Sequence, residues 1–240
     1  MKFSINQKDL QESLGFCQNV IERRSTLPIL SNVLIEAKDK KLKITATDLD
    51  MIFVHNISNV EINEEGETTT NSSIMHDIVR KFSVGKKINV ETITESKLQL
   101  ESEKSIFKLN TIDAKEFPLS EDDLIGDDIT LNSQSFLKLL NKCKFSISSD
   151  ETRHYLSGIF FHFTQNEDKN YLTAVSTDSH RMSISKMRLD QSINFEPIIL
   201  PKKTIHHLCS LLENLNGNIK ILNSKSKIKF IRLATHFSEI

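Results

Sequence analysis

The fold of this chain is decided by the stretch Leu172-Thr-Ala-Val-Ser-Thr-Asp-Ser-His-Arg-Met182 and by an earlier stretch that repeats its outline, Leu42-Lys-Ile-Thr-Ala-Thr-Asp-Leu-Asp-Met51. In each stretch an alternating strand runs into a Thr-Asp pair and then resumes as a second strand. Because Asp48 and Asp178 recur in both copies, we expect them to stabilise a turn by accepting hydrogen bonds from nearby backbone. His180 and Arg181 occur only in the second copy.

The rest of the chain repeats in the same order. Residues 3–5 and 129–131 are short alternating strands, and each is followed by an asparagine suited to cap a helix, Asn6 or Asn132. A second helix is expected within 71–82 and again within 201–215. The apolar faces expected for these second helices are Ile74, Ile78 and Phe82 in the first copy and Ile205, Leu208, Leu212 and Leu215 in the second. A period of about 130 residues is typical of a duplicated domain rather than of a solenoid repeat.

Each copy therefore contains two amphipathic helices and about six to eight short strands, including a strand over 29–37 that turns at Asp39-Lys40. This pattern predicts an α+β fold in which two helices pack on antiparallel sheet. The composition of the acidic segment 119–128 predicts a linker between a domain at 1–118 and a domain at 129–240. Residues 232–240 match nothing in the first copy, so we expect the second domain to be incomplete at its C-terminus.

Composition limits the class of protein. The 240 residues contain 31 basic and 32 acidic residues, so no global positive charge indicates nucleic acid, although this balance leaves room for a locally basic surface. Cys17, Cys143 and Cys209 are far apart, lack CxxC spacing and fall on apolar helix faces, where buried thiols are expected. No stretch is long and apolar enough for a signal peptide or a membrane span. We expect a cytoplasmic protein without a membrane partner.

The polar cluster at 177–181 also admits an enzymatic interpretation, a small hydrolase that uses His180 and Asp178. No nucleophile or metal motif accompanies these two residues. His206 and His207 resemble a metal pair, but adjacent residues on a helix diverge by ~100° and no cysteine or carboxylate completes the site. P-loop, GxGxxG, HExxH and zinc-finger patterns are absent from the sequence. The sequence thus predicts a protein that is not an enzyme, with no catalytic residue, no metal site and no cofactor.

An ordered set of motifs carries a resemblance to a known family. These motifs are Thr26-Leu-Pro-Ile-Leu30, Thr45-Ala-Thr-Asp-Leu-Asp-Met51, Glu116-Phe-Pro118, Arg153-His-Tyr-Leu-Ser-Gly158 and Ser176-Thr-Asp-Ser-His-Arg181. On these residues the chain resembles the bacterial DNA polymerase sliding clamp, the beta subunit of DNA polymerase III, from residue 1 to about residue 231. Ser179 stands where the family usually has glycine. The resemblance implies tandem DNA clamp domains, of which the third clamp domain of the family is absent from this sequence.

The resemblance also implies a function. Clamps of this family are homodimeric rings that encircle double-stranded DNA without reading its sequence and tether the replicative polymerase and the clamp loader through short linear peptides. The implied peptide groove on domain 2 consists of Arg153, Leu156, Thr177, His180, Arg181 and Met182. The implied DNA-binding residues are Arg24, Arg80, His154, Tyr155, Lys202 and Lys203, with Lys138 and Lys142 as weaker candidates. Ile106 and Phe107 match the edge that closes the ring.

Two non-enzymatic hypotheses follow. In the first, the chain is a DNA polymerase processivity factor that acts by encircling DNA. In the second, it is a truncated clamp-like fragment that does not close a ring and serves as a peptide-interaction module. Ring closure in the family pairs the first domain of one chain with the third domain of its neighbour, which this sequence does not contain. A ring is retained on circular DNA and released when the DNA is cut, whereas a fragment is not retained.

Overall fold

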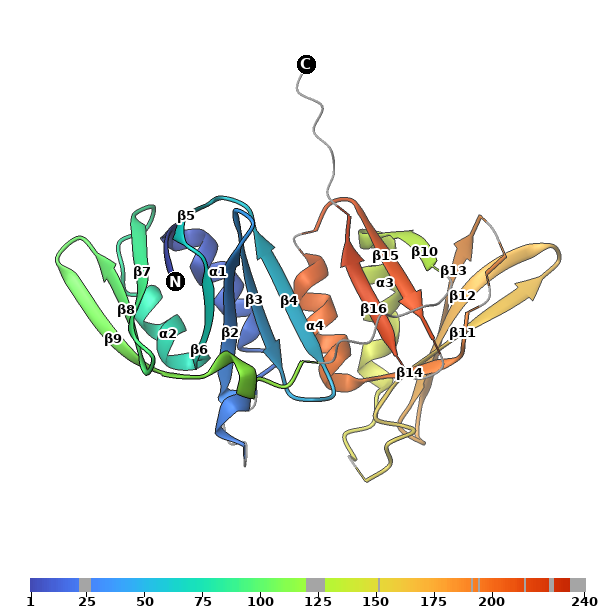
Figure 1. The fold of residues 1–240 in the computed structure, drawn as a ribbon. Coiled ribbons are helices and arrows are strands. Elements are labelled where there is room, and N and C mark those ends of the chain that lie inside the picture. Colours follow the sequence, from blue (N-terminus) through green and yellow to red (C-terminus); the bar gives the residue numbers. More distant parts are fainter. Residues whose placement is uncertain are drawn as a thin grey trace, which may run out of the picture. The chain divides into compact units, whose positions relative to one another are not determined.

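The computed structural model describes residues 1–21, 27–119, 128–150, 152–190, 192–193, 195–213, 215–224 and 227–233. The chain divides into two compact units, Met1–Ser120 (unit 1) and Glu121–Ile240 (unit 2). Each unit combines helices with antiparallel strands, which confirms the predicted α+β class (Figure 1). Most of the expected acidic linker, residues 120–127, lies outside the described residues.

Unit 1 is built around a nine-stranded antiparallel sheet with the strand order β4-β3-β2-β6-β9-β8-β7-β1-β5. Its elements are β1 (Lys2–Asn6), α1 (Gln7–Cys17), the 3-10 turn η1 (Pro28–Ser31), β2 (Asn32–Lys38), β3 (Lys41–Thr47), β4 (Ile52–Ile57), β5 (Val60–Glu64), β6 (Gly66–Asn71), α2 (Ser72–Val79), β7 (Lys87–Thr94), β8 (Lys97–Ser102), β9 (Ser105–Ile112) and η2 (Ala114–Glu116). The strand β9 joins the two halves of the sheet because it pairs with β8 along most of its length and with β6 at its end.

Unit 2 has two separate antiparallel sheets in its described residues, β10-β15-β16 and β13-β12-β11-β14. Its elements are β10 (Asp128–Asn132), α3 (Ser133–Cys143), the 3-10 turn η3 (Lys144–Ser146), β11 (Gly158–Asn166), β12 (Lys169–Thr177), β13 (Met182–Leu189), β14 (Ile198–Pro201), α4 (Lys202–Glu213), β15 (Asn218–Asn223) and β16 (Ile228–Arg232). With β5 left out, the order of elements from β10 to β16 matches the order from β1 to β8 in unit 1, as the sequence repeat predicts. Within the described residues, β5 and β9 of unit 1 have no counterpart in unit 2.

Each unit has its own hydrophobic core, in which side chains from both helices meet side chains from the strands. In unit 1, α1 packs against α2, and in unit 2, α3 packs against α4 (Figure 1). Phe3 and Leu10 are fully buried in the first core, and Phe136 is fully buried in the second. The apolar residues predicted for 201–215 are confirmed as buried: Ile205, Leu208 and Leu212 lie on α4, and Leu215 follows its end.

The helix starts agree with the capping residues expected from the sequence. The side-chain oxygen of Asn6 accepts a hydrogen bond from the amide of Lys8, and that of Asn132 accepts one from the amide of Ser135. Asn71 caps α2 in the same way. Such bonds satisfy amides in the first turn that have no partner within the helix.

The predicted turn at Asp39-Lys40 is also confirmed. Both residues have positive φ, 50° and 57°, and they connect β2 to β3 as a two-residue hairpin. Glu167 and Asp168 repeat this turn between β11 and β12 with φ of 46° and 60°. Two left-handed residues in succession give the turn whose twist matches that of antiparallel strands.

Three local predictions were wrong. Residues 29–31 form the 3-10 turn η1 instead of the start of a strand, since Pro28 has the fixed φ that favours the first position of a helical turn. The strands β5 and β6 were not predicted. Of the face expected for the second helix, Phe82 is buried and Ile78 packs partly against the core, but Ile74 is 53% exposed. The buried residues of α2 itself are Ser72, Met75 and Val79.

Candidate functional site

The two Thr-Asp loops have the same backbone. The amide of Met51 donates to the Asp48 carboxylate (2.7 Å), and the amide of Arg181 donates in the same way to Asp178 (3.0 Å). Residues Leu49 and Ser179 both take a left-handed conformation, with φ of 78° and 77°. This geometry confirms the predicted structural role of the two aspartates: they close the loops that connect β3 to β4 and β12 to β13.

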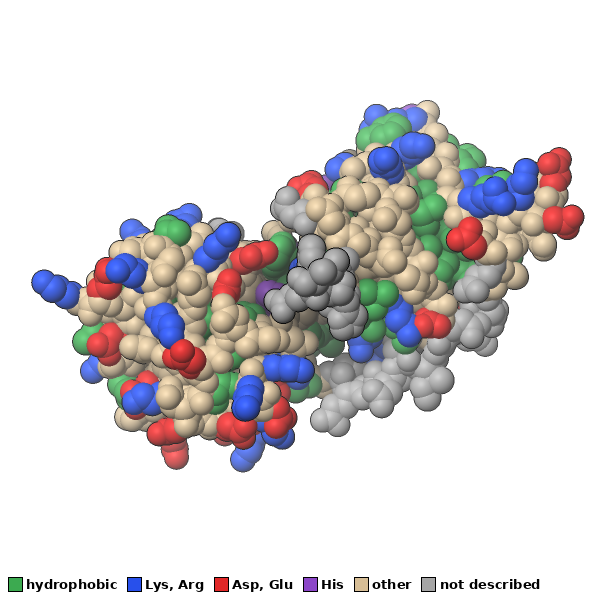
Figure 2. All heavy atoms as spheres, turned by 90° about the horizontal axis from the view of Figure 1, so that it is seen from above, with side chains coloured by type: hydrophobic (Ala, Val, Ile, Leu, Met, Phe, Trp, Pro, Cys, Tyr) green, Lys and Arg blue, Asp and Glu red, His purple; other side chains and the backbone are tan. Residues whose placement is uncertain are grey.

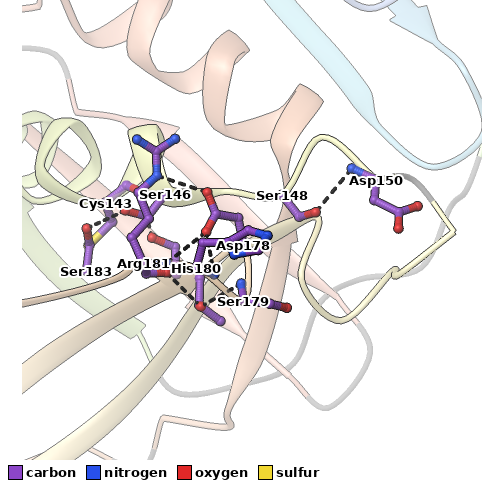
Figure 3. Close-up of polar contacts among 11 residues, drawn as sticks. Cys143, Ser146, Ser148, Asp150, Asp178, Ser179, His180, Arg181 and Ser183 are labelled. Carbon is purple, nitrogen blue, oxygen red and sulfur yellow. Dashed lines mark hydrogen bonds and ion pairs between the residues drawn. The ribbon is translucent and has the colours of Figure 1, made fainter.

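The loop of unit 2 carries a fixed guanidinium that the loop of unit 1 lacks. Nε of Arg181 lies 2.9 Å from Oδ2 of Asp178 (Figure 3). The guanidinium carbon lies 5.6 Å from the ring centroid of Phe145. The main-chain carbonyl of Arg181 accepts a hydrogen bond from the hydroxyl of Thr177. The Arg181 side chain is therefore oriented by a carboxylate and an aromatic ring, while more than half of its surface remains exposed.

The Asp178 carboxylate is stabilised in its charged form. The backbone amides of Arg181 and His180 donate to it and hold the pKa of Asp178 below its ordinary value, with a smaller contribution from the Arg181 side chain. A carboxylate that is fixed in this way accepts hydrogen bonds but does not offer a proton near neutral pH. This environment suits a positioning role for Asp178 rather than general acid catalysis.

A second segment, 150–157, contacts the loop through Arg153. Nε of Arg153 lies 3.2 Å from Oδ2 of Asp150, and Nη1 of Arg153 donates to the hydroxyl of Ser179 at 3.3 Å. The Thr152 hydroxyl and amide hold the pKa of Asp150 below its ordinary value. The segment folds back on itself, because the amide of Leu156 donates to the carbonyl of Arg153. Arg153 thus links the segment to the loop.

The residues expected to form a peptide groove are only in part joined by contacts. Hydrogen bonds connect Arg153 to the Thr177–Arg181 loop through Ser179. His180 is exposed, and Met182, the first residue of β13, is 60% exposed. Leu156 is half-buried and is tied to this region through its backbone. Arg153 is thus the residue of this group whose side chain reaches the loop, while His180 and Met182 leave polar and apolar surface exposed on either side of Arg181 in the chain.

Phe145 is a residue of this region that the sequence did not indicate. It lies in η3, directly after α3, and is one of the large apolar side chains that stay exposed. Its neighbour Ser146 shares a hydrogen bond with Ser183 of β13 at 2.7 Å, which fixes η3 beside the loop. An aromatic residue at the end of a helix has no distinguishing pattern in a single sequence, so only the structure shows that it contacts Arg181.

The residues expected to contact DNA lie on exposed parts of both units. Arg80 caps the end of α2 and pairs with Asp77, and it lines a hollow of about 480 Å³ together with His76 and Gln18. Lys202 and Lys203 are exposed in the first turn of α4. Arg24 lies outside the described residues.

Lys202 and Lys203 are poorly placed for the stability of α4. The N-terminal end of a helix carries partial positive charge, so two cations in the first turn, with no acidic residue there, oppose the helix dipole.

The other DNA candidates of unit 2 are also exposed. His154 and Tyr155 lie in the turn that precedes β11, with Tyr155 70% exposed, and Lys138 and Lys142 are exposed on α3. Basic and acidic side chains are interspersed over the face seen in Figure 2, in agreement with the balanced charge of the chain. Any attraction for a polyanion must come from local groups of cations.

The expected ring-closing residues lie on β9. Ile106 is 56% exposed, and the ring of Phe107 packs edge-on against Phe82 with 5.7 Å between centroids. Between Ser105 and Asn110, β9 pairs with β8 on one edge, and its other edge has no partner strand within the described part of the chain. Unpaired backbone beside exposed apolar side chains is the form in which a sheet can continue into another chain.

The remaining chemically active side chains are mostly buried. His206 is exposed while His207 is buried, so the two rings point in different directions as expected for neighbours on a helix. Burial lowers the pKa of His207 to about 4 and raises the pKa of Cys17 to about 12.

Within the described residues, no three His, Cys, Asp or Glu side chains lie close enough together to hold a metal ion. In the same part of the chain, none of the helices is long and apolar enough to cross a membrane.

Comparison with known proteins agrees with the fold. The Caulobacter vibrioides beta sliding clamp is 32% identical over 232 residues, which are 96% of this chain and 62% of that protein. The structure superimposes on the Caulobacter crescentus beta sliding clamp with a TM-score of 0.92 at 31% identity, and on the Bartonella birtlesii sliding clamp bound to griselimycin with a TM-score of 0.91 at 34% identity. Each match covers 96% of this chain and 62% of the other.

Family profiles match both units. The profile of the DNA polymerase III beta subunit, N-terminal domain, covers residues 1–121, and that of the central domain covers residues 130–238. The chain spans about 62% of the length of the curated relative from Caulobacter vibrioides. With both profiles in family order and the same fold in solved relatives, the chain belongs to the DNA polymerase III beta subunit family.

Proposed function

We propose that this chain acts as a DNA polymerase processivity factor of the sliding-clamp type, as part of a ring around duplex DNA in the cytoplasm. Unit 2 docks short peptides of the replicative polymerase and of the clamp loader. The observation that carries the proposal is the contrast between the Thr47–Met51 loop of unit 1 and the Thr177–Arg181 loop of unit 2. They share one backbone, but only the loop of unit 2 presents an oriented arginine, Arg181, beside Arg153 and exposed Met182.

The chemistry of this surface fits an extended peptide. Met182 and Leu156 offer apolar contact to a hydrophobic anchor residue, and the guanidinium groups of Arg181 and Arg153 can donate to main-chain carbonyls or to a carboxylate of the peptide. Because Asp178 and Phe145 already hold Arg181, little side-chain entropy is lost when a peptide binds. The proposed groove is thus preorganised at its cationic side.

The Bartonella birtlesii clamp is bound to griselimycin, and we propose that this chain binds the same compound in the loop groove. We expect Arg181→Ala to weaken griselimycin binding by about 10-fold or more, the size expected for a lost hydrogen bond to a charged group. The matched control is Met51→Ala, which changes the equivalent position in the loop of unit 1. If a calorimetric titration gave equal affinities for Arg181→Ala and the unaltered protein, Arg181 would not be part of the groove.

For DNA we propose contact with phosphates alone, through Arg80, His154, Tyr155, Lys202 and Lys203, with Arg24 retained from the family resemblance. Each phosphate contact contributes about 0.9 to the slope of log affinity against log salt. Replacing Lys202 and Lys203 by glutamine should therefore reduce that slope by about 1.8 on a linear duplex. Lys97→Gln with Lys108→Gln, on strands β8 and β9, is the control and should leave the slope unchanged.

Retention on circular DNA distinguishes the two hypotheses of ring and fragment. A ring, whether closed by a second copy or by further domains, stays on nicked circular DNA at high salt and is lost when the circle is cut. Binding of griselimycin without topological retention would instead support a peptide-interaction module. No chemistry is proposed at Asp178 and His180. An ester or phosphate hydrolysis that disappears in His180→Ala would contradict that part of the proposal.

A further inference from the structure

One hydrogen bond in unit 2 joins two segments that are far apart in the sequence. Nη1 of Arg153 donates to the hydroxyl of Ser179 at 3.3 Å, and Nε of the same guanidinium lies 3.2 Å from Oδ2 of Asp150. The Asp150 carboxylate is itself fixed, because its other oxygen accepts hydrogen bonds from the amide and the hydroxyl of Thr152. The Arg153 guanidinium is thus held by a carboxylate at one nitrogen and by a hydroxyl at another.

The turn that carries Arg153 is repeated in unit 1 without the guanidinium. In unit 2 the amide of Leu156 donates to the carbonyl of Arg153 at 2.8 Å. In unit 1 the amide of Leu30 donates to the carbonyl of Leu27 at 3.1 Å, so Leu27 is the counterpart of Arg153. The side chain of leucine has no hydrogen-bonding group, and the turn therefore folds without an arginine at this position.

The loop that carries Ser179 is also repeated in unit 1, where leucine replaces the serine. Ser179 has φ of 77° and its counterpart Leu49 has φ of 78°. The amide of each donates to the hydroxyl of the threonine two positions earlier, Thr177 or Thr47. Glycine adopts this left-handed conformation at lower cost than serine does. The conformation thus belongs to the fold of both loops, whereas the hydroxyl and its bond to Arg153 belong to unit 2 alone.

We propose that Ser179 is a positioning residue for peptide binding, because its hydroxyl holds the Arg153 guanidinium beside the Thr177–Arg181 loop. This inference rests on the proposed peptide groove. A guanidinium has more N–H donors than the contacts with Asp150 and Ser179 use, and about half of the Arg153 side chain is exposed. The remaining donors are available to main-chain carbonyls or to a carboxylate of a peptide.

Loss of the Ser179 hydroxyl should have a modest and specific effect. Arg153 would keep its pairing with Asp150, but its guanidinium would be held on one side only. More side-chain entropy would then be lost when a peptide fixes it. A separation of 3.3 Å is long for an N–H···O bond, so we expect a change of a few fold in affinity and no loss of the groove.

The mobility of Arg153 tests the contact directly. In nitrogen relaxation measurements on the 240-residue protein, the order parameter of the Arg153 Nε–H group should fall in Ser179→Gly. Ser179→Asn should retain most of the order, because asparagine tolerates the left-handed conformation and carries an acceptor oxygen in its side chain. Leu49→Gly makes the same backbone change in unit 1 and is the control. An unchanged order parameter in Ser179→Gly would overturn the proposal.

Griselimycin is the probe for the effect on binding. Ser179→Gly should weaken griselimycin by about 2- to 10-fold in a calorimetric titration, the range expected for one hydrogen bond, and Leu49→Gly should not weaken it. Arg153→Ala should weaken it at least as much. Ser179→Gly should have no further effect when it is added to Arg153→Ala, because Ser179 acts through Arg153. An equal effect of Ser179→Gly with and without Arg153 would contradict the proposal.

Stability separates positioning from folding. Because glycine adopts the left-handed conformation without steric cost, neither Ser179→Gly nor Leu49→Gly should lower the urea midpoint of its unit. A lower midpoint for Ser179→Gly would assign the hydroxyl to the fold instead.

Two further results separate this inference from the proposed groove. If Arg181→Ala weakened griselimycin but Arg153→Ala and Ser179→Gly did not, the role of Ser179 would be wrong and the groove would stand. If the unaltered protein did not bind griselimycin, the proposed groove would itself be overturned, and this inference with it.

Discussion

The two units repeat one order of elements, but they differ in the residues that follow the loop aspartates and in the strands β5 and β9, which have no counterpart in the described residues of unit 2. Asp48 and Asp178 accept the same backbone hydrogen bonds, yet the residues after them are Leu49 and Asp50 in unit 1 and Ser179 and His180 in unit 2. In each loop the aspartate binds the backbone amides of the residues that follow it. The side chains of those residues can therefore differ while the same hydrogen bonds are kept. The shared aspartates close the loop in each unit, and the residues that differ are those that we propose unit 2 uses for binding.

The largest effect is expected in the cores, which are separate. Phe136 of α3 is buried between the rings of Phe161 and Phe230, at 6.1 and 6.0 Å between centroids. Phe136→Ala should lower the free energy of unfolding of unit 2 by about 3–5 kcal/mol. Native-state hydrogen exchange should show this loss in unit 2 and leave unit 1 unchanged, while the matched change Leu10→Ala should affect unit 1 alone. An equal loss of protection in both units would mean that they unfold as one.

Acid should weaken unit 2 through His207. Burial holds its pKa at about 4, below the ordinary 6.5, so the unfolded state binds the additional proton between these values. The stability due to neutral His207 is therefore complete above about pH 6.5 and is lost as the pH falls toward 4, by at most about 3 kcal/mol. Urea unfolding at pH 7 and at pH 4.5 measures the loss. His207→Gln should remove most of this pH dependence, and a variant that keeps all of it would exclude His207 as the cause.

The close approach of β11 and β14 should make Gly158 sensitive. A Cβ atom at Gly158 would lie 2.3 Å from the carbonyl oxygen of Leu200, so the two strands would have to separate. Gly158→Ala should cost about 1–3 kcal/mol, as other additions to a packed interior do. The matched position in unit 1 is Asn32, whose amide donates to the hydroxyl of Thr69 at 3.0 Å, and Asn32→Ala should cost about 1 kcal/mol. No change in thermal unfolding for Gly158→Ala would contradict the expected cost of separating β11 and β14.

The smallest effect is expected for Asp178→Asn at neutral pH. The backbone amides of Arg181 and His180 lower the pKa of Asp178, so its stabilising effect is present above the ordinary pKa of about 3.9 and is lost as the pH falls through the lower value. Carboxyl chemical shifts in a pH titration should show this lowered pKa. Asp178→Asn should also release Arg181 and weaken griselimycin binding, whereas Asp48→Asn should not. Equal affinity of the two variants would show that orientation of Arg181 does not matter.

The local predictions that succeeded rest on short-range chemistry. Asn6 and Asn132 cap helices, and Asp39-Lys40 makes a hairpin turn, because these outcomes depend on the residue and its immediate neighbours. In the second helix Ile78 and Phe82 were predicted correctly, but Met75 is buried where Ile74 was expected, and spacing alone does not distinguish these two neighbours. The contact of Phe145 with Arg181 joins residues 36 positions apart that no local pattern connects.

The sequence by itself determined the duplication, the capped helices, the paired turns and the role of the two aspartates, since each follows from composition and spacing within a few residues. The tertiary structure decided which side chains are buried, how Arg181 is held, and that β9 joins the two halves of one sheet in unit 1 while the described residues of unit 2 form two separate sheets. Strand pairing between distant segments sets these features. The free energy of such pairing depends on what lies alongside a strand in space, which the order of residues along the chain does not specify.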